Sequence, residues 1–314
     1  MAEMIKKATR ESFGEALIEL AKTNENIIVL DADLAAATKT GVFKKAYPER
    51  FIDCGIAESN MVSIAAGLAT CGKIPFAASF AMFSAGRAFE QVRNSVCYPK
   101  LNVKIVGSHA GISVGEDGAT HQCCEDIALM RAIPGMTVLN PCDHYEMIAA
   151  VKAMAEKNGP CYVRLGRLAV ESVNNNDDYK FEIGKGITLK DGSDITIIAT
   201  GLMVQEAVKA AKALEADGID ARVINIHTIK PLDEELIIKA AKETGRIVTC
   251  EEHNVVGGLG EAVSSLLCEK CPVPVTKIGV NDVFGHSGPA VDLLKEFGLS
   301  ADNIVATVKK VLAK

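Results

Sequence analysis

The sequence lacks both an excess of positive charge and a long apolar run. It contains 34 Lys and Arg residues against 40 Asp and Glu residues, with a net charge of −6 and a pI near 5.6. This balance argues against a nucleic-acid-binding surface, which is usually basic. The longest apolar stretch, Ile74–Gly86, is shorter than the about 20 residues that a membrane helix needs, and Arg87 ends it. We therefore expect neither nucleic acid nor a membrane as a partner.

The N-terminus lacks the apolar core of a signal peptide, and the cysteines lack the spacing of a zinc site. Cys123 and Cys124 are adjacent, and the pair Cys268 and Cys271 has no second pair nearby. A disulfide framework is not expected in a chain of 314 residues without a signal. Five further cysteines lie among apolar residues, where cysteine packs as a small hydrophobe: Cys54, Cys71, Cys97, Cys161 and Cys250. We predict ten reduced thiols, no metal bound by this chain, and a cytoplasmic location.

Apolar segments of strand and helix type alternate along the first half of the chain. The expected strands cover 27–30, 51–54, 103–106, 136–139 and 161–165, and the expected helices 11–22, 59–70, 86–98, 124–132 and 145–157. This alternation predicts a largely parallel sheet with helices on both faces.

A polar run, Asn174–Asp178, separates this half from a second alternating half, and such runs are typical of linkers. The second half has expected strands at 195–199, 221–226, 246–250 and 272–278, and expected helices at 204–216, 233–243, 261–269 and 301–312. We therefore predict an α/β protein with one domain at 1–173, a linker at 174–188 and a smaller domain at 189–314.

Residues whose side chains can bind a ligand or react follow several of the predicted strands. Ligands of such sheets collect beyond the carboxyl ends of the strands, so these residues could converge there. The richest segment, Gly115–Gln122, holds two acids, an imidazole and a hydroxyl, which suit a ligand with hydroxyl groups or phosphate. The other groups after strands are Asp31 and Asp33, Gly55–Glu58, His109, and Arg164 and Arg167.

Glu58 and a group of phenylalanines allow two interpretations each. Glu58 lies between an apolar strand and an apolar helix, where the helix N-terminus favours an acid in any case. It could equally be a desolvated carboxyl group that faces a ligand. Phe76, Phe80 and Phe83 could surround a flat aromatic ligand or simply belong to the core.

Several of these segments together resemble the transketolase family. Asp53–Met61, Ser79–Phe83, Gly115–Gln122 and Asn140–Asp143 are similar, in order and spacing, to its pyrimidine-binding half. Ile229–Asp233 and Glu251–Gly260 are similar to its C-terminal domain, so the resemblance covers nearly the whole chain. It implies a thiamine-diphosphate pyrimidine-binding fold followed by a transketolase C-terminal fold.

One family signature is missing. The family binds the diphosphate and its metal through a separate domain marked by Gly-Asp-Gly followed by paired asparagines, and no Gly-Asp-Gly occurs here. The resemblance therefore implies the C-terminal subunit of a split transketolase. Thiamine diphosphate would be shared with an N-terminal, diphosphate-binding subunit that also holds Mg²⁺ or Ca²⁺. Two copies of this chain and two partners would form a heterotetramer.

The resemblance also implies roles for individual residues at the cofactor. Glu58 would bind the pyrimidine nitrogen N1′ and stabilise the imino form that takes the proton from the thiazolium C2. Phe80 and Phe83 would stack around the pyrimidine, and Asp33 would be a further cofactor contact. The family's usual tyrosine near this ring is Gly86 here, so we expect a looser pocket or one filled by a neighbour such as Phe89.

At the substrate, the resemblance implies transfer of a two-carbon ketol unit from a ketose phosphate to an aldose phosphate, as in the pentose phosphate pathway. His109 and His121 would act in catalysis and face the hydroxyl groups of the sugars. Asp117 would accept a hydrogen bond from the C2 hydroxyl of the acceptor. Arg10 and Arg167 would grip the substrate phosphate with their planar guanidinium groups.

The phosphate site also departs from the family pattern. Ala37 replaces the family's phosphate-binding serine, so Thr38 would substitute for it, or the preferred phosphosugar would differ.

Three alternatives remain open. A half-enzyme of the deoxyxylulose-phosphate synthase type shares the Thr-His-Gln part of the acidic loop, but His109 and Gly115–Gly118 favour transketolase. The β subunit of a 2-oxo-acid dehydrogenase has the same two-domain layout and the glutamate, but the acidic loop is not expected there. A regulatory or assembly subunit that keeps the fold is opposed by the presence of Glu58, His109 and His121.

Overall fold

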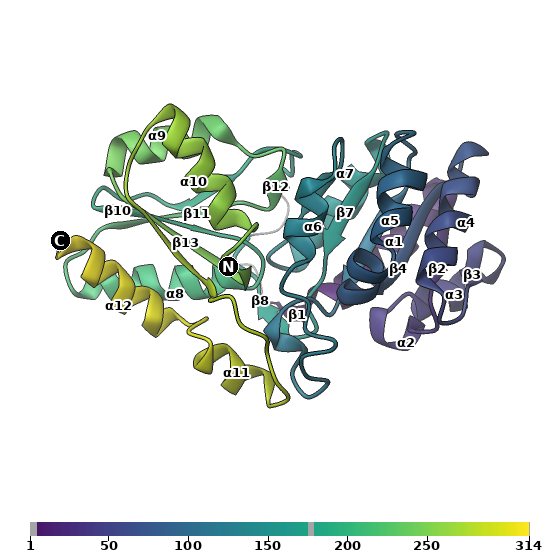
Figure 1. Cartoon of the computed structure of the whole chain (residues 1–314), viewed down its shortest axis with the longest axis horizontal. Helices are drawn as coiled ribbons and strands as arrows, with labels where there is room; N and C mark the ends of the chain where they lie inside the picture. Colours follow the sequence, from purple (N-terminus) through teal and green to yellow (C-terminus); the bar gives the residue numbers. More distant parts are fainter. Residues whose placement is uncertain (1–4, 175–178, 314) are drawn as a thin grey trace.

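Two α/β units lie side by side along the long axis of the molecule (Figure 1). The computed structural model describes residues 5–174 and 179–313, so residues 175–178 of the expected linker lie outside the described part. The predicted fold class, an α/β protein with two mostly parallel sheets flanked by helices, is confirmed. The exact domain boundaries stay a prediction.

The first unit is built on a seven-stranded sheet in the order β12-β6-β7-β5-β4-β2-β3. Its strands are β2 (Ile27–Asp31), β3 (Phe51–Asp53), β4 (Ile74–Phe80), β5 (Lys104–Ser108), β6 (Thr137–Leu139), β7 (Cys161–Arg164) and β12 (Thr228–Lys230). Neighbouring strands are parallel except β12, which is antiparallel to β6. Strands β2, β4, β5 and β7 are almost completely buried, as parallel strands covered on both faces should be.

Helices cover both faces of this sheet. They are α1 (Thr9–Thr23), α2 (Ala35–Thr38), α3 (Gly41–Ala46), α4 (Glu58–Thr70), η2 (Met82–Arg87), α5 (Phe89–Gln91), η3 (Val92–Cys97), α6 (Asp126–Ala132) and α7 (His144–Glu156). Phe13 of α1 and Met147 of α7 belong to the core on one face. Met61 of α4 and Ile127 of α6 belong to the core on the other face. Helix α7 begins where Asp143 caps the Glu146 N–H at 3.0 Å, which satisfies an otherwise unpaired donor.

The second unit is built on a five-stranded sheet in the order β14-β13-β10-β11-β9. Its strands are β9 (Ile187–Lys190), β10 (Ile195–Ala199), β11 (Ala221–Asn225), β13 (Ile247–Asn254) and β14 (Val275–Val280). Strand β9 is antiparallel to β11, and the other neighbouring pairs are parallel. The helices are α8 (Met203–Ala216), α9 (Glu234–Thr244), α10 (Leu259–Lys270), α11 (Ala290–Glu296) and α12 (Ala301–Leu312).

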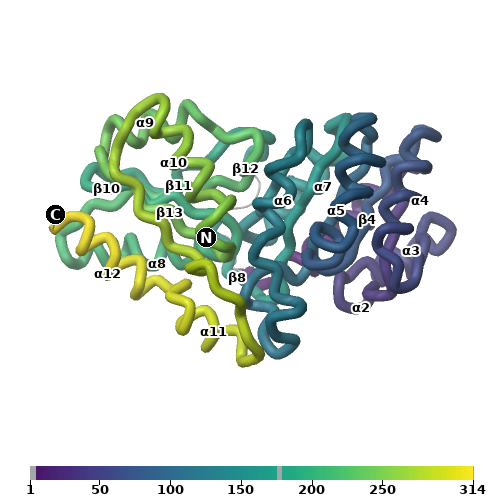
Figure 2. The backbone as a smooth tube through the Cα atoms, viewed as in Figure 1, coloured from purple at the N-terminus to yellow at the C-terminus, as the bar shows by residue number. Residues whose placement is uncertain are grey.

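The second half of the chain also completes the first sheet. After β11, the chain returns to the first unit and adds β12 as its edge strand, with Thr228 opposite Leu139 (Figures 1 and 2). A small two-stranded sheet pairs β1 (Lys6–Ala8) with β8 (Ala169–Glu171) in antiparallel register. The two units are therefore tied by backbone hydrogen bonds as well as by side-chain packing.

The structure departs from the sequence predictions at several elements. The apolar stretch at Ile74–Gly86 contains strand β4, which was not predicted, and the short elements β1, β8, β9, β12, α2, α3 and α11 were also missed. The helix expected at 86–98 begins at Met82 instead and contains the two π-helical segments η2 and η3. Such segments often occur at functional sites.

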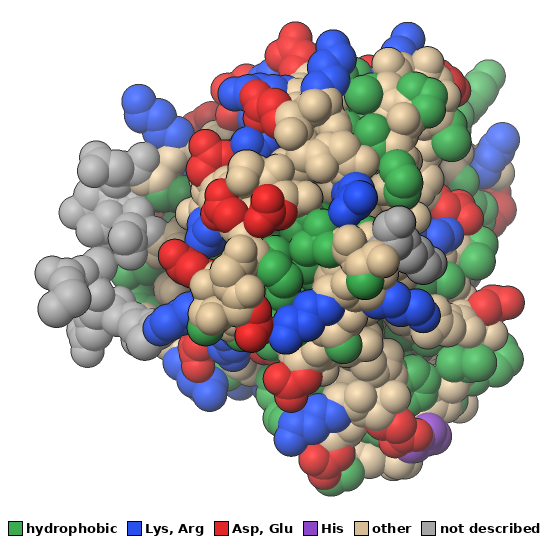
Figure 3. Space-filling model, turned by 90° about the vertical axis from the view of Figure 1, so that its left-hand side faces the viewer, with side chains coloured by type: hydrophobic (Ala, Val, Ile, Leu, Met, Phe, Trp, Pro, Cys, Tyr) green, Lys and Arg blue, Asp and Glu red, His purple; other side chains and the backbone are tan. Residues whose placement is uncertain are grey.

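The thiols and the surface agree with an ordinary globular chain. All ten cysteines are free, although Cys71 is exposed and not packed among apolar residues as expected. The end of the molecule formed by the second unit carries basic and acidic side chains intermixed (Figure 3). In residues 5–174 and 179–313, no helix has the length and apolarity to cross a membrane.

Candidate active site

An aromatic cluster forms at the carboxyl ends of β4 and β5, from residues that the sequence analysis singled out. The rings of Phe80 and Phe83 are stacked, with centroids 6.0 Å apart. His109 stacks on Phe80 at 4.0 Å, and His121 meets Phe83 edge-on at 5.3 Å. The structure thus brings the acidic loop and the phenylalanine segment together although about 40 residues separate them along the chain. Flat apolar surfaces of this kind suit an aromatic ligand ring.

Glu58 is the first residue of α4, and its side chain is only 1% exposed. Its Oε2 accepts a hydrogen bond from Arg87 Nη1 at 2.8 Å. Arg87 also lies over the ring of Phe83, 4.8 Å from its centroid. Arg87 therefore links the carboxyl group to the aromatic cluster. Arg87 was not among the predicted site residues, although a charge at the end of an apolar stretch was a usable signal.

His109 is held in one orientation by both ring nitrogens. Nδ1 lies 2.9 Å from the Ser108 hydroxyl, and Nε2 lies 3.4 Å from Arg10 Nη1. Because a guanidinium group can only donate, Nε2 accepts and the ring proton resides on Nδ1. Burial, and then the charges of Arg10, Arg167 and Lys39, lower the pKa of His109 to about 3. His109 is therefore neutral at physiological pH, and its backbone sits in the left-handed region at φ 54°.

Three cations lower the pKa of His109, and one of them, Arg10, also contacts its ring. Arg10 extends from α1 and donates to the Ala37 carbonyl oxygen at 2.8 Å, and burial lowers its pKa. Arg167 donates to the Val114 carbonyl oxygen and to Glu116 Oε2 at 2.6 Å. Lys39 ends α2 in a left-handed conformation, and its carbonyl group packs against Gly14 of α1. Such a cluster suits an anionic group.

Lys39 was missed by the sequence analysis. Its place beside Arg10 depends on the turn that ends α2, and no local sequence pattern predicts that turn.

Two other predicted residues, Asp117 and Asp33, are exposed. Among the described residues, the exposed carboxylate of Asp117 has no hydrogen-bond or ion-pair partner, and this leaves it free to bind a ligand. Asp33 is also exposed, at φ 62°, and only its backbone N–H is engaged, with Asp53 Oδ1 at 3.2 Å. No contact joins Asp33 to the aromatic cluster in the described part of the chain.

The two residues named as replacements for missing family side chains do not take those places. Thr38 is completely buried, and its hydroxyl donates to Asp31 Oδ2 at 2.7 Å, so it cannot replace the family's serine as a phosphate ligand. The space beside Gly86 is taken by Met82 and not by Phe89. A Cβ at Gly86 would lie 2.5 Å from Met82 Cε, whereas Phe89 packs into the core.

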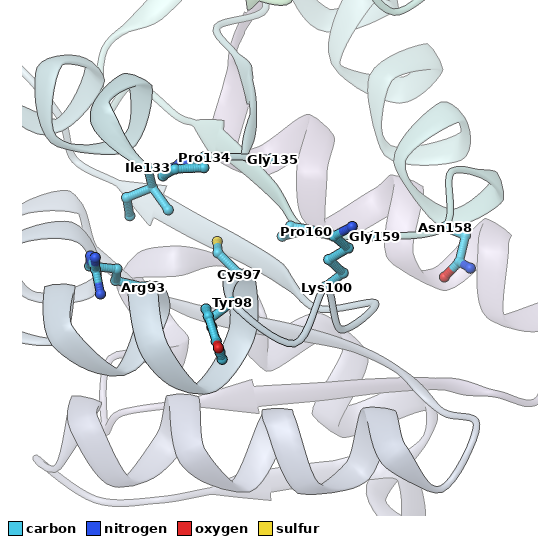
Figure 4. A pocket seen from close by; sticks show the side chains of 10 residues that line it. All are labelled: Arg93, Cys97, Tyr98, Lys100, Ile133, Pro134, Gly135, Asn158, Gly159 and Pro160. Carbon is cyan, nitrogen blue, oxygen red and sulfur yellow. The ribbon is translucent and has the colours of Figure 1, made fainter.

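One cavity near the first sheet lies away from this site. A cavity of about 590 Å³ is lined by Arg93, Cys97, Tyr98 and Lys100 and by residues 133–135 and 158–160 (Figure 4). These residues lie near the N-terminal ends of β5, β6 and β7, whereas the predicted site residues lie beyond carboxyl ends. Within residues 5–174 and 179–313, no group of three or more His, Cys, Asp or Glu side chains is placed to hold a metal ion.

Both α/β units match models of known protein families. The family model "Transketolase, pyrimidine binding domain" matches residues 5–172, and "Transketolase, C-terminal domain" matches residues 184–304. The chain therefore belongs to the transketolase family and corresponds to its C-terminal part. The predicted resemblance is confirmed.

Relatives and solved structures agree with this assignment. The chain is 52% identical to a putative transketolase C-terminal section of Methanocaldococcus jannaschii, over 98% of this chain and 97% of the relative. It is 45% identical to the 6-deoxy-6-sulfo-D-fructose transketolase subunit SqwH of a Clostridium species, over 96% and 94%. It is 43% identical to one of the subunits of an apulose-4-phosphate transketolase from Phocaeicola vulgatus, over 98% of each chain.

Among solved structures, one described as a split gene transketolase, inactive beta4 tetramer, superposes with a TM-score of 0.91 and 54% identity, over 98% of this chain and 99% of that chain. The transketolase of Campylobacter jejuni superposes with a TM-score of 0.83 and 27% identity, but this chain covers only 47% of it. Relatives of matching length thus exist beside a relative of about twice the length. The chain is a transketolase C-terminal subunit.

Proposed function

We propose that this chain supplies the pyrimidine side of a thiamine-diphosphate site that a separate, diphosphate-binding N-terminal subunit completes. The observation that carries the proposal is the cluster of Phe80, Phe83, His109 and His121 beside buried Glu58. The cluster fits a flat ring, and the carboxyl group beside it fits a ring nitrogen. The proposal assigns Mg²⁺ or Ca²⁺ to the partner, because longer single-chain relatives contain a further half that this chain does not match.

The residues of this chain would bind, orient and exchange protons. Phe80 and Phe83 would hold the pyrimidine, and Glu58 would hold a proton at its N1′, with Arg87 fixing the carboxyl group. Thiamine diphosphate, when bound, supplies the electron sink for breaking and forming carbon–carbon bonds. Neutral His109 would accept a hydrogen bond from a sugar hydroxyl group at Nε2, in exchange for its 3.4 Å contact with Arg10.

The substrates would be sugars with an anionic end. Arg10, Arg167 and Lys39 would bind that end, while His121 and Asp117 would face the hydroxyl groups. By their names, two relatives act on a sulfonated and on a phosphorylated sugar. We place this chain with ketose and aldose phosphates, as in the pentose phosphate pathway. Because Ala37 offers no hydroxyl group, Arg10, Arg167 and Lys39 would bind the substrate phosphate in place of the family's serine.

The assembly would be a heterotetramer in the cytoplasm, with a dimer of this chain at its centre. One solved relative is described as an inactive tetramer of β chains. This supports self-association of the C-terminal subunit and inactivity in the absence of the partner.

The test is reconstitution with a diphosphate-binding N-terminal transketolase subunit. The mixture with thiamine diphosphate and Mg²⁺ should transfer a ketol unit from xylulose 5-phosphate to ribose 5-phosphate. Consumption of pyruvate without ketol transfer would support the synthase or dehydrogenase alternatives instead. Ketol transfer from a sulfonated ketose in preference to a phosphorylated one would correct the substrate class but keep the reaction.

A further inference from the structure

A short segment of the second unit packs directly on the acidic loop of the first. Gly285–Gly288, which leads into α11, lies beside Gly115–Gln122 (Figures 1 and 2). The Gln122 Nε2 donates to the His286 carbonyl oxygen at 2.9 Å. The Ser287 hydroxyl donates to the Glu116 carbonyl oxygen. These contacts join parts of the chain more than 160 residues apart.

The contacts fall on both sides of Asp117. Glu116 precedes it and accepts the bond from Ser287. Gly118 follows it and packs against the same serine, since a Cβ at Gly118 would lie 3.4 Å from the Ser287 nitrogen. The carboxylate of Asp117 itself stays exposed. Ser287 therefore contacts the backbone on both sides of Asp117, in addition to the turn in which the Gly118 N–H donates to the Gly115 carbonyl oxygen.

Gln122 anchors the other end of the loop. It is only 5% exposed, and its Nε2 also donates to the carbonyl oxygens of Ile112 and Gly115, both at 3.3 Å. Gly285 leaves no spare room there, because a Cβ on it would overlap Gln122 Oε1 and lie 2.8 Å from Ile112 Cδ1. Because the Gln122 side chain ties the end of the loop to Gly115, a shift of this side chain would displace the loop that carries Asp117.

We propose that Gly285–Gly288 is a positioning segment through which the C-terminal unit sets Asp117 for the acceptor sugar. The inference rests on the proposed function, because it assigns Asp117 to a sugar. It gives the C-terminal unit a part in the reaction beyond structural support. A displacement of about 1 Å in such a loop is enough to weaken binding and turnover substantially.

The segment Gly285–Gly288 affects binding of the acceptor sugar more than binding of the donor sugar. Glu58, Phe80 and Phe83, which face the cofactor, lie on α4, β4 and η2, and among the described residues no hydrogen bond joins them to Gly285–Gly288. Changes in the segment should therefore affect the acceptor while leaving formation of the donor adduct unchanged.

The experiment uses the reconstituted holoenzyme and two variants, Gly285→Ala and Ser287→Ala, with Ser265→Ala on the exposed side of α10 as the matched control. KM is measured separately for the aldose acceptor and the ketose donor, and the donor half-reaction is followed with an artificial oxidant in place of the acceptor. We expect the acceptor KM to rise about tenfold in Gly285→Ala and less in Ser287→Ala. The donor half-reaction and the control should match the parent.

Two results would overturn the inference. One is an unchanged acceptor KM in both variants. The other is an equal loss for donor, acceptor and the half-reaction, which would show a general structural defect. If Gly285→Ala fails to fold, Ser287→Ala alone decides, because it only removes a hydroxyl group. Failure of the proposed function is a separate outcome, since the parent itself would then show no ketol transfer.

Discussion

Replacing Glu58 with glutamine separates a catalytic role of this carboxyl group from a structural one. Glutamine keeps the size of the side chain and one oxygen that can accept the hydrogen bond from Arg87. The Glu58 side chain is 1% exposed, but that of Arg87 is 52% exposed, so water can solvate the arginine when the charge of its partner is lost. We therefore expect Glu58→Gln to lower the free energy of unfolding by only about 1 kcal/mol.

The catalytic loss should be much larger. A glutamine cannot share a proton with the pyrimidine nitrogen, and loss of such a group typically lowers kcat by about 10²- to 10⁴-fold. That loss corresponds to about 3–5 kcal/mol of activation free energy. The assay is ketol transfer by the reconstituted enzyme, together with thermal unfolding of the variant.

The matched control is Glu19→Gln, an exposed acid on α1 that pairs only with Lys22 among the described residues. It should retain the activity of the parent. A Glu58→Gln enzyme with the parent's kcat would refute the role assigned to Glu58.

Three further predictions concern the same site. Lys39→Gln should raise the KM for a phosphorylated ketose about fivefold, because one of three cations is lost. The KM for an unphosphorylated ketose should stay unchanged. Equal effects on both KM values would contradict an anion-binding role of Lys39. Phe80→Ala should weaken binding of thiamine diphosphate to the assembled enzyme at least fivefold by calorimetry, because about 1 kcal/mol of ring contact is lost; unchanged affinity would remove Phe80 from the cofactor site. Folding lowers the pKa of His109 from 6.5 to about 3, so only the unfolded chain takes up a proton at this residue as the pH falls below 6.5. A falling pH therefore favours the unfolded state. Relative to His109→Gln, the parent should lose about 2 kcal/mol of unfolding free energy between pH 7 and pH 5 in denaturant titrations, and a constant difference would show that His109 is not held neutral.

The sequence predicted regular elements best where their apolar pattern was complete. The strand at Ile195–Ala199 and the helix at Ala301–Leu312 have the predicted bounds. Strand β4 was missed because Ile74–Phe80 is apolar on both faces, and without alternation a short apolar run does not distinguish strand from helix. Strand β12 has three residues and exists only through its pairing with β6, which no local pattern reveals.

Single residues of the candidate site could be named from the sequence, but the contacts among them could not. The sequence analysis brought out Glu58, Phe80 and His109, whose neighbours along the chain carry a strong pattern. Arg87 was missed because its role comes from a contact with a residue 29 positions away.

The error at Thr38 has a similar cause. Its hydroxyl was expected to face the ligand, but the buried carboxylate of Asp31 binds it in the folded protein. The orientation of a side chain in a short turn depends on such tertiary partners, and the sequence does not give them.

The most direct test of the central claim is ketol-transfer activity measured while the diphosphate-binding chain is titrated into a fixed amount of this chain, with thiamine diphosphate and Mg²⁺ in excess. The shared-site account predicts no activity without the partner and a rise that saturates at one partner per copy of this chain. Ketol transfer by this chain alone, or saturation far from equal proportions, would contradict it.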